Sequence, residues 1–298
     1  MELRDFEIFV RVAEDGDFSA AARTLSLTPS AVSKSIARLE EHLGRRLLHR
    51  SSRSMRLTPE GQSFLEAVHR VLAAMEEAEA VGSAVPSGTL RIRSVPTFAR
   101  YQLAPLMPAF RRLHPKLRIE FLLTNERTAW LDDGVDVAIA SGDLPSSSLI
   151  ARRIASSRWI ICAAPSYLAE YGAPTLPADL DQHECLNFSM PTKWNLWSRA
   201  EGRTNDRRNR SCSIVANQGD MLLALARAGA GIARLAEFHI SEDLRAGRLV
   251  ALFPEYQDRS EEPIYVLYQN RRHLSPRIRV FLTFLEEAFA RPPWRTEM

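Results

Sequence analysis

The stretch that decides the fold of the N-terminal part reads Thr28-Pro-Ser-Ala-Val-Ser-Lys-Ser-Ile-Ala-Arg-Leu-Glu-Glu-His-Leu-Gly44. Threonine is a good helix N-cap, proline suits the first helical position, and glycine is a common C-cap. These signals predict a helix from Pro29 to about Leu43. The face that should pack inward repeats at helical spacing and comprises Val32, Ile36, Leu39 and Leu43.

Two shorter helical patterns precede this helix. The first starts at Leu3 and ends at Gly16-Asp17, and Ser19 is a plausible N-cap for the second, Ala20–Leu25. Two helices joined by a tight turn form a helix-turn-helix, whose second helix enters the major groove of DNA with its N-terminal end first. The outward side of that helix carries Ser30, Lys34, Ala37 and Glu41, with Ser33 and Arg38 on its flanks.

A basic segment follows Gly44 and has the alternating character of a two-stranded wing. From residue 19 to residue 58 the chain carries eight basic and two acidic side chains, a local net charge of +6. The whole chain has 39 basic and 36 acidic residues, so its net charge of +3 hides this patch. A concentrated positive patch is what a phosphate binder needs.

A long helix is predicted next, from Thr58 to about Val81. Its apolar residues step by 4, 3, 4 and 3, which is typical of a helix that pairs with another helix. The predicted dimerisation seam comprises Phe64, Val68, Val71 and Met75, continued by Ala78. Acidic residues outnumber basic ones along this helix, which favours dimerisation over DNA contact.

The remaining part, residues 89–298, alternates predicted strands and helices. Leu90–Val95, Leu117–Leu123 and Val135–Ser141 are expected strands, with a helix at Ala99–Leu113 and a short one at Arg127–Asp133. The further expected elements are an apolar run at Arg158–Ala163, a helix at Gly219–Ala228, strands at Ala230–Leu235, Leu249–Phe253 and Ile264–Gln269, and a closing helix at Ser275–Ala290. This alternation favours mostly parallel sheet covered on both faces, in two small α/β lobes.

Composition narrows the function classes. The chain has 298 residues, 45% of them hydrophobic, which suits a globular protein of two or three domains. Its three cysteines are widely spaced, so neither a disulfide framework nor a metal pair is expected. No apolar run approaches ~18 residues and the N-terminus lacks signal-peptide character, which predicts a cytoplasmic protein outside the membrane.

These blocks together resemble the LysR-type transcriptional regulators. The most specific are Phe18-Ser-Ala-Ala-Ala-Arg-Thr-Leu25, Thr28–Glu40, Leu47-Leu-His-Arg-Ser-Ser-Arg53 and Leu57-Thr-Pro-Glu-Gly61. Looser matches follow in the family's order, such as Asp136-Val-Ala-Ile-Ala and Ala228-Gly-Ala-Gly-Ile-Ala. The resemblance implies a winged helix-turn-helix over 1–58, a linker helix and hinge over 59–88, and an effector domain over 89–298 with two α/β lobes like periplasmic binding proteins.

The resemblance also implies partners. Such proteins are typically dimers or tetramers on an interrupted inverted repeat of double-stranded DNA, with a small-molecule effector between the lobes. RNA polymerase is a further candidate partner, and no cofactor or metal is expected. Ser33-Lys34 departs from the commoner Ser-Gln or Ser-Arg of the family's reading helix, which bears on base preference rather than on docking.

The candidate site residues form two groups. For DNA they are Ser30, Ser33, Lys34, Arg38, Arg50 and Arg53. For the effector they are Ser94, Thr97, Thr124, Asn187, Phe188 and Arg234. Lysine can donate to guanine in the groove, and a helix N-terminus near Thr97 suits a carboxylate or another polar group. Plain helix capping explains Thr97 and Thr124 equally well, and an exposed strand end is the simpler interpretation of Arg234.

Two alternatives remain, an α/β enzyme and a cytoplasmic small-molecule-binding protein. Gly229-Ala-Gly231 opens like a dinucleotide fingerprint, but Arg234 stands where the third glycine belongs, and the motif ends a helix instead of opening one. Solute-binding proteins of two lobes are usually exported, whereas no signal is visible. The basic winged module disfavours both alternatives.

Overall fold

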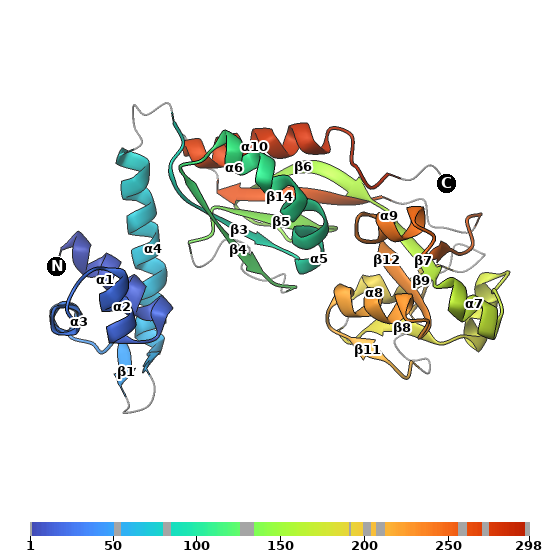
Figure 1. Ribbon diagram of the computed structural model, residues 1–298, viewed down its shortest axis with the longest axis horizontal. Coiled ribbons are helices and arrows are strands. Elements are labelled where there is room, and N and C mark those ends of the chain that lie inside the picture. Colours follow the sequence, from blue (N-terminus) through green and yellow to red (C-terminus); the bar gives the residue numbers. More distant parts are fainter. Residues whose placement is uncertain are drawn as a thin grey trace.

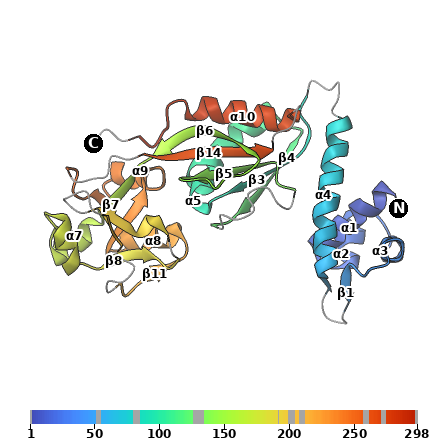
Figure 2. The same ribbon diagram turned by 180° about the vertical axis from the view of Figure 1, so that it is seen from behind.

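The computed structural model describes residues 2–50, 55–79, 85–125, 134–190, 192–198, 204–206, 212–255, 261–269 and 274–295. A small helical module and the long helix α4 lie at one end of the molecule, and two α/β lobes follow (Figures 1 and 2).

The N-terminal module contains α1 (Leu3–Asp15), α2 (Phe18–Thr24), α3 (Pro29–Leu43) and a wing of two antiparallel strands, β1 (Leu48–Arg50) and β2 (Met55–Leu57). The predicted caps of α3 are confirmed: the Ala31 N–H donates to Thr28 Oγ1 at 3.2 Å, and Gly44 is left-handed with φ 63°. The predicted cap of α2 is wrong. Asp17 accepts the Ala20 N–H at 2.8 Å, because the helix begins at Phe18, before Ser19.

The core of this module joins the three helices to the wing. Val32, Ile36 and Leu39 are fully buried, as their spacing predicts. Helix α4 (Pro59–Glu79) closes the module, since Phe64 packs against Phe9 with ring centroids 5.2 Å apart. The start of α4 requires a glycine at position 61, because a Cβ there would lie 2.0 Å from the Leu47 carbonyl oxygen.

The first lobe is built on a five-stranded sheet in the order β4-β3-β5-β14-β6. Its strands are β3 (Gly88–Ser94), β4 (Leu117–Leu123), β5 (Val137–Ser141), β6 (Leu149–Ser157) and β14 (Glu262–Gln269). One face is covered by α10 (Pro276–Phe289) and by a helical run made of α5 (Pro96–Phe98), the π turn η1 (Ala99–Leu103), the 3-10 turn η2 (Ala104–Leu106) and α6 (Met107–Leu113).

The second lobe has a sheet in the order β11-β8-β12-β7-β13. Its strands are β7 (Trp159–Ala163), β8 (Cys185–Phe188), β11 (Val215–Ala216), β12 (Ile232–Ala236) and β13 (Val250–Ala251). Its helices and turns are α7 (Pro165–Tyr171), η3 (Pro177–Gln182), η4 (Lys193–Asn195), α8 (Gly219–Arg227) and α9 (Glu237–Arg245), with a small ribbon of β9 (Leu196–Ser198) and β10 (Thr204–Asp206).

Both sheets are mixed. In each, four of the five strands run in one direction, in line with the expectation of mostly parallel sheet, and one strand runs the other way. In the first lobe β14 runs antiparallel to both β5 and β6, and in the second β7 runs antiparallel to β12 and β13. The cause is the chain path. The chain enters the second lobe as β7 and returns to the first as β14, and it is these two entering strands that run against the rest of their sheets. The expected helix at Arg127–Asp133 lies outside the described residues.

The sequence patterns missed β6 and the irregularity of the helical run after β3. Strand β6 lies at the edge of its sheet and exposes Arg152 and Arg153, so it carries no continuous apolar run. The run that was expected to start at Ala99 starts at Pro96, which fits the first position of a helix. That earlier start places Thr97 in the first turn.

Candidate functional site

The outward face of α3 carries three of the residues predicted to contact DNA. Ser30 and Lys34 are exposed, and Ser33 is half-buried. All three lie in the N-terminal half of the helix, and the buried stripe of α3 faces away from them into the module core. The module therefore presents a short polar and cationic surface of the kind that approaches base edges.

Arg38 lies on the same helix but has a partner inside the protein. Its guanidinium forms an ion pair with Asp5 of α1, whose side chain is fully buried, and Ser35 Oγ donates to the same carboxylate at 2.7 Å. Burial raises the pKa of Asp5, but hydrogen bonds from Arg38, the Glu2 backbone and Ser35 outweigh it and lower that pKa to about 2. Arg38 thus ties α3 to α1, a contact that the sequence pattern did not reveal.

The wing carries the remaining DNA candidates. Arg50 ends β1 and pairs with Met55 of β2. Arg53 belongs to residues 51–54, which lie outside the described residues, as does the side chain of Arg50. Arg45, Arg46 and Arg56 are exposed near the wing, so its described part remains basic.

The predicted seam of α4 divides into two halves. Phe64 packs against Phe6 and Phe9 of its own module, and Val68 is 1% exposed within the single chain. Val71 and Met75, one and two turns further on, are 43% and 37% exposed. Among the described seam residues, Val71 and Met75 present the most apolar surface for another molecule.

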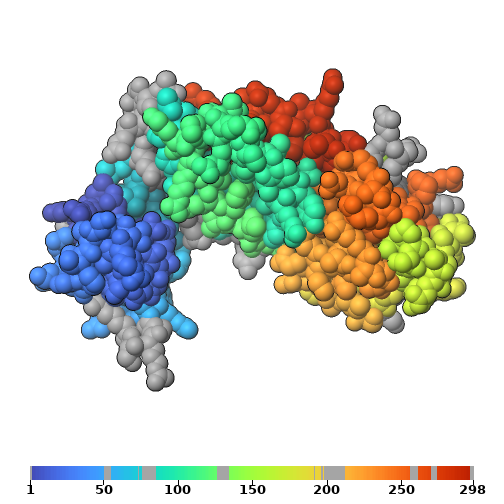
Figure 3. Space-filling view, in the orientation of Figure 1, coloured from blue at the N-terminus to red at the C-terminus, as the bar shows by residue number. Residues whose placement is uncertain are grey.

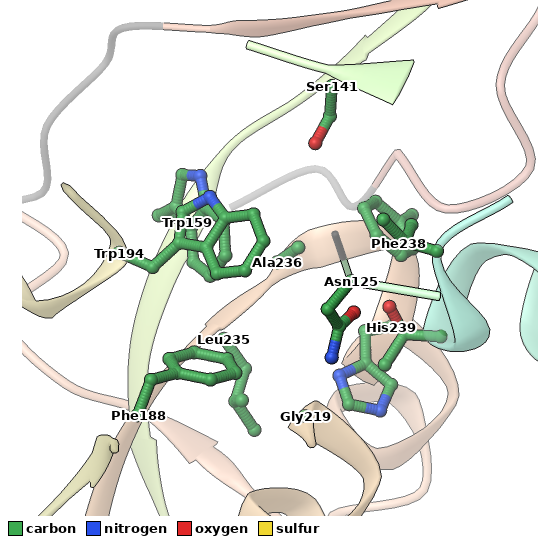
Figure 4. Close-up of a pocket in the computed structure, with 12 residues that line it drawn as sticks. Asn125, Ser141, Trp159, Phe188, Trp194, Gly219, Leu235, Ala236, Phe238 and His239 are labelled. Atoms are coloured by element: carbon green, nitrogen blue, oxygen red, sulfur yellow. The ribbon is translucent and has the colours of Figure 1, made fainter. Parts of the chain in front are cut away.

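A narrow cleft lies between the two lobes (Figure 4). It encloses about 430 Å³ of empty space, mouth included. Both lobes supply its lining, which comprises Val95, Thr97, Asn125, Ser141, Trp159, Phe188, Trp194, Gly219, Leu235, Ala236, Phe238 and His239. A mostly apolar cleft with few polar groups is the usual form of a small-molecule site.

Aromatic side chains form much of the cleft wall. Trp159 and Trp194 are stacked with ring centroids 5.6 Å apart and an interplanar angle of 28°. Phe188 packs on Trp194 at 5.2 Å. In Figure 4 these three residues line one side of the cleft, and Asn125, Phe238 and His239 lie across from them.

The polar groups of the cleft also connect the lobes. Asn125 Nδ2 donates to the Asn217 carbonyl at 2.9 Å and to Gln218 Oε1 at 3.0 Å. His239 Nε2 lies 3.3 Å from Asp220 Oδ1, and its ring packs edge-on against Tyr101 of the first lobe at 4.7 Å. Burial lowers the pKa of His239 although Asp220 opposes that shift.

The lobes touch where two helices begin. Thr97 lies in the first turn of α5 and Gly219 opens α8. A Cβ at position 219 would lie 2.9 Å from Thr97 Cγ2, closer than real contacts come. In the space-filling view the green part of the first lobe touches the orange part of the second (Figure 3). Glycine at position 219 therefore permits this close approach.

The predicted effector residues divide between cleft and surroundings. Thr97 and Phe188 line the cleft. Ser94 is buried and donates from Oγ to the Val95 carbonyl at 3.1 Å, and the Thr124 N–H donates to the Ser94 carbonyl at 3.1 Å. These two stand behind the lining, at the ends of β3 and β4.

Asn187 and Arg234 are not part of the lining. Asn187 is 2% exposed, accepts from Trp197 Nε1 at 3.0 Å and donates to Cys212 Sγ at 2.7 Å. Successive residues of a strand face opposite sides, so Phe188 reaches the cleft and Asn187 does not. Arg234 is half-buried rather than at an exposed strand end: its guanidinium lies 5.2 Å from the Trp159 ring centroid and donates to the Trp194 carbonyl at 3.2 Å.

Sequence reasoning missed most of the lining. Trp159 stood inside an apolar run that was interpreted as core, and Trp194 and Asn125 lie in connecting segments without a pattern. Gly219 offered the one usable signal, a predicted helix start in the second lobe equivalent to that at Thr97. No described helix is long and apolar enough to cross a membrane, and the described residues contain no cluster of three or more potential metal ligands.

Two stretches of the chain match known families. Residues 3–62 match "Bacterial regulatory helix-turn-helix protein, lysR family", and residues 83–290 match "LysR substrate binding domain". The chain is 35% identical over 286 residues to the HTH-type transcriptional regulator CrgA of Neisseria meningitidis serogroup C, a match that covers 95% of each chain. It is 32% identical to the HTH-type transcriptional activator AaeR of Escherichia coli K12, covering 96% of this chain and 94% of AaeR.

Solved structures agree with the sequence relatives. The structure of CrgA, described as a LysR-type transcriptional regulator, superposes with a TM-score of 0.65 at 34% identity and covers 97% of this chain and 99% of CrgA. The full-length structure of AphB, a virulence activator of Vibrio cholerae, superposes with a TM-score of 0.61 at 28% identity, covering 96% of this chain and 98% of AphB.

Proposed function

The chain belongs to the LysR family of bacterial transcriptional regulators, and from this premise we propose that it reads an interrupted inverted repeat in double-stranded DNA as an even-numbered oligomer, under the control of a small-molecule effector. Its helix-turn-helix module binds the DNA and its substrate-binding domain receives the effector. The observation that carries the proposal is the pairing, in one chain, of a basic winged module with a lined cleft between two lobes.

The proposed DNA contacts follow from the position of each residue in the module and from its charge. Ser30, Ser33 and Lys34 lie at the N-terminal end of α3, the end of a recognition helix that meets base edges. Arg50 and Arg53 of the wing are assigned to phosphates or the minor groove, because their positive charge suits both. Arg38 is assigned to holding α3 against α1 through Asp5 instead of to base contact.

The oligomer is assigned to α4. Val71 and Met75 lie on one face of that helix at a spacing of four residues and remain exposed in the single chain. Pairing α4 with a second copy would cover them, and a two-fold dimer matches the symmetry of an inverted repeat. Phe64 and Val68 are left out of this interface because their own module already covers them.

The effector is assigned to the cleft between the lobes. Thr97, Phe188 and the residues around Trp159 and His239 come from both lobes, so a bound molecule would contact both. A ligand shifts an equilibrium by its differential affinity for two states. An effector that contacts both lobes would therefore favour their closed arrangement. This would change the position of the two helix-turn-helix modules of the dimer on DNA.

The test is capture of genomic DNA by the purified full-length protein, followed by footprinting on the most enriched site. We expect an interrupted inverted repeat protected on one face of the duplex. Failure to enrich any DNA at moderate salt would contradict the proposal. A parallel capture at lower salt distinguishes two kinds of binding. Non-specific electrostatic affinity increases for every DNA sequence at low salt, whereas operator recognition enriches one sequence over the others.

A further inference from the structure

The described lining of the cleft contains no Asp, Glu, Lys or Arg side chain. Its polar groups are the hydroxyls of Thr97 and Ser141, the amide of Asn125 and the imidazole of His239. The side chain of His239 is 3% exposed, and such burial favours its neutral form. The cavity therefore offers hydrogen bonds without a fixed charge.

Charges near the cleft already have partners within the protein. The Arg234 guanidinium lies over the Trp159 ring and donates to the Trp194 carbonyl at 3.2 Å. Asp220 faces His239 and lies 3.7 Å from Arg100 Nη1. Lys193 Nζ lies 2.9 Å from Asp143 across the lobes, and the buried Glu237 pairs with Arg158. A carboxylate effector would lose its hydration on entering the cleft. The neighbouring cations already have partners and would not compensate for that loss, so binding of the carboxylate would be unfavourable.

The helix N-termini at the cleft do not make the binding of a carboxylate favourable. Helix α5 begins with Pro96, which has no N–H to donate. Helix α8 begins at Gly219 and carries Asp220 in its first turn, where the carboxylate offsets the positive end of the helix dipole. A free anion at this helix start would lie close to that carboxylate.

Aromatic rings form the walls of the cleft. Its empty space, mouth included, is about 430 Å³. The indoles of Trp159 and Trp194 and the rings of Phe188 and Phe238 supply those walls. Aromatic faces gain most from another ring stacked or set edge-on against them.

One buried donor beside the cleft has no acceptor among the residues that the structure describes. Trp194 Nε1 is buried and makes no hydrogen bond within the described part of the chain. A buried indole N–H normally finds a partner, and an unsatisfied one requires an explanation. A ligand oxygen beside the Trp194 ring would supply the acceptor.

On the footing of the effector role proposed above, we propose that the cleft binds an uncharged, planar aromatic compound bearing an oxygen acceptor, such as an aromatic amide or ketone. The ring enters between the aromatic walls, and the oxygen accepts from Trp194 Nε1 or from the Thr97 hydroxyl. The indole N–H, which has no partner among the described residues, favours a ligand with an oxygen acceptor. The uncharged lining favours a neutral acceptor over an aromatic carboxylate.

Calorimetric titration of the full-length protein with 4-hydroxybenzamide and 4-hydroxybenzoate tests the charge, because these two molecules have nearly the same shape. We expect the amide to bind at least about tenfold more tightly. Cyclohexanecarboxamide tests the ring and should bind more weakly than benzamide. Tighter or equal binding of the benzoate or of the cyclohexane compound overturns the proposal, and so does failure of all the probes to bind.

Two variants locate the binding. Trp194→Leu should weaken the amide at least about fivefold, whereas Tyr171→Leu, which removes a 59% exposed ring elsewhere in the second lobe, should leave its affinity unchanged. Equal loss in both variants contradicts the cleft assignment. Footprinting without added compound is carried out in parallel. If the operator is protected but the amide does not bind more tightly than the benzoate, only the proposed ligand class is wrong. If no operator is protected, the proposed function itself is contradicted.

Discussion

The carboxylate of Asp5 in the first helix binds the Arg38 guanidinium and so gives Arg38 a structural role. Asp5 occupies a position of α1 that is fully buried, and an ionised carboxylate there needs a counter-charge. Arg38 supplies it from α3, and Ser35 adds a hydrogen bond. The angle between α1 and the DNA-reading helix is thus held by a polar contact as well as by apolar packing.

Replacing Asp5 by Asn should lower the free energy of unfolding by about 1–3 kcal/mol, because Arg38 loses its charged partner. The folded pKa of about 2 lies below the ordinary value of 3.8, so ionised Asp5 stabilises the fold above pH ~4 and this contribution is lost as the pH falls toward 2. Urea denaturation from pH 7 to pH 3 measures both effects.

The control is Glu41→Gln, which removes an exposed charge from α3. We expect its unfolding midpoint to stay within error of the parent protein. The gap between the parent and Asp5→Asn should narrow toward pH 3, and a gap that stays constant or widens would contradict the role of Asp5.

Replacing Lys34 by Ala tests base reading by α3. We expect operator affinity to fall by about 1–3 kcal/mol, the range for one base contact, while affinity for random DNA falls less. Fluorescence anisotropy at fixed salt with both duplexes gives the two affinities. Lys116→Ala removes an exposed lysine from the effector domain and should change neither; equal loss on both duplexes in Lys34→Ala would assign Lys34 to phosphate.

At the scale of elements, α4 has two tasks along one apolar stripe. Its first half holds Phe64 against α1, and its second half exposes Val71 and Met75. The 3.5-residue period predicted the apolar stripe but not the position at which its residues change from buried to exposed. That position depends on how far the N-terminal module covers α4.

Replacing Val71 by Glu should raise the dimer dissociation constant at least about tenfold, since a charge would be buried in an apolar interface. Gln62→Glu places the same charge on an exposed position of the same helix and should leave dimerisation intact. Analytical ultracentrifugation of the full-length variants measures both. A Val71→Glu protein that sediments like the parent would exclude this face.

At the scale of the whole molecule, the two lobes are joined by paired chain crossings. Strands β6 and β14 pair along their length up to Ser157 and Glu262, where the chain passes between the lobes. Arg158 and the buried Glu237 form an ion pair at the same place. Two linked crossings allow the lobes to approach each other at the cleft while their sheets stay intact.

Replacing Gly219 by Ala should hold the lobes apart, because the new Cβ would lie 2.9 Å from Thr97 Cγ2. We expect a slightly larger radius of gyration in X-ray scattering and weaker binding of the amide probe. The double variant Gly219→Ala with Thr97→Ser removes the methyl group and should restore closure. If the double variant stays as open as the single one, this contact does not limit closure.

The sequence alone determined the elements whose signals are local. Thr28, Pro29 and Gly44 defined the recognition helix, and the period of α4 marked its apolar stripe, because caps and periodicity act within a few residues. The family resemblance rests on the same blocks, and the matching families confirm it. Thr97 and Phe188 were identified as cleft residues from their places in that pattern.

Only the tertiary structure decided the rest. The cleft draws on residues from Val95 to His239, and its lining depends on how two chain crossings set one lobe against the other. The orientation of Asn187, the stacking of Trp159 on Trp194 and the ion pair of Arg38 with Asp5 all join segments far apart in the chain. Local sequence signals reach a few residues, whereas these contacts exist only once the whole chain has packed.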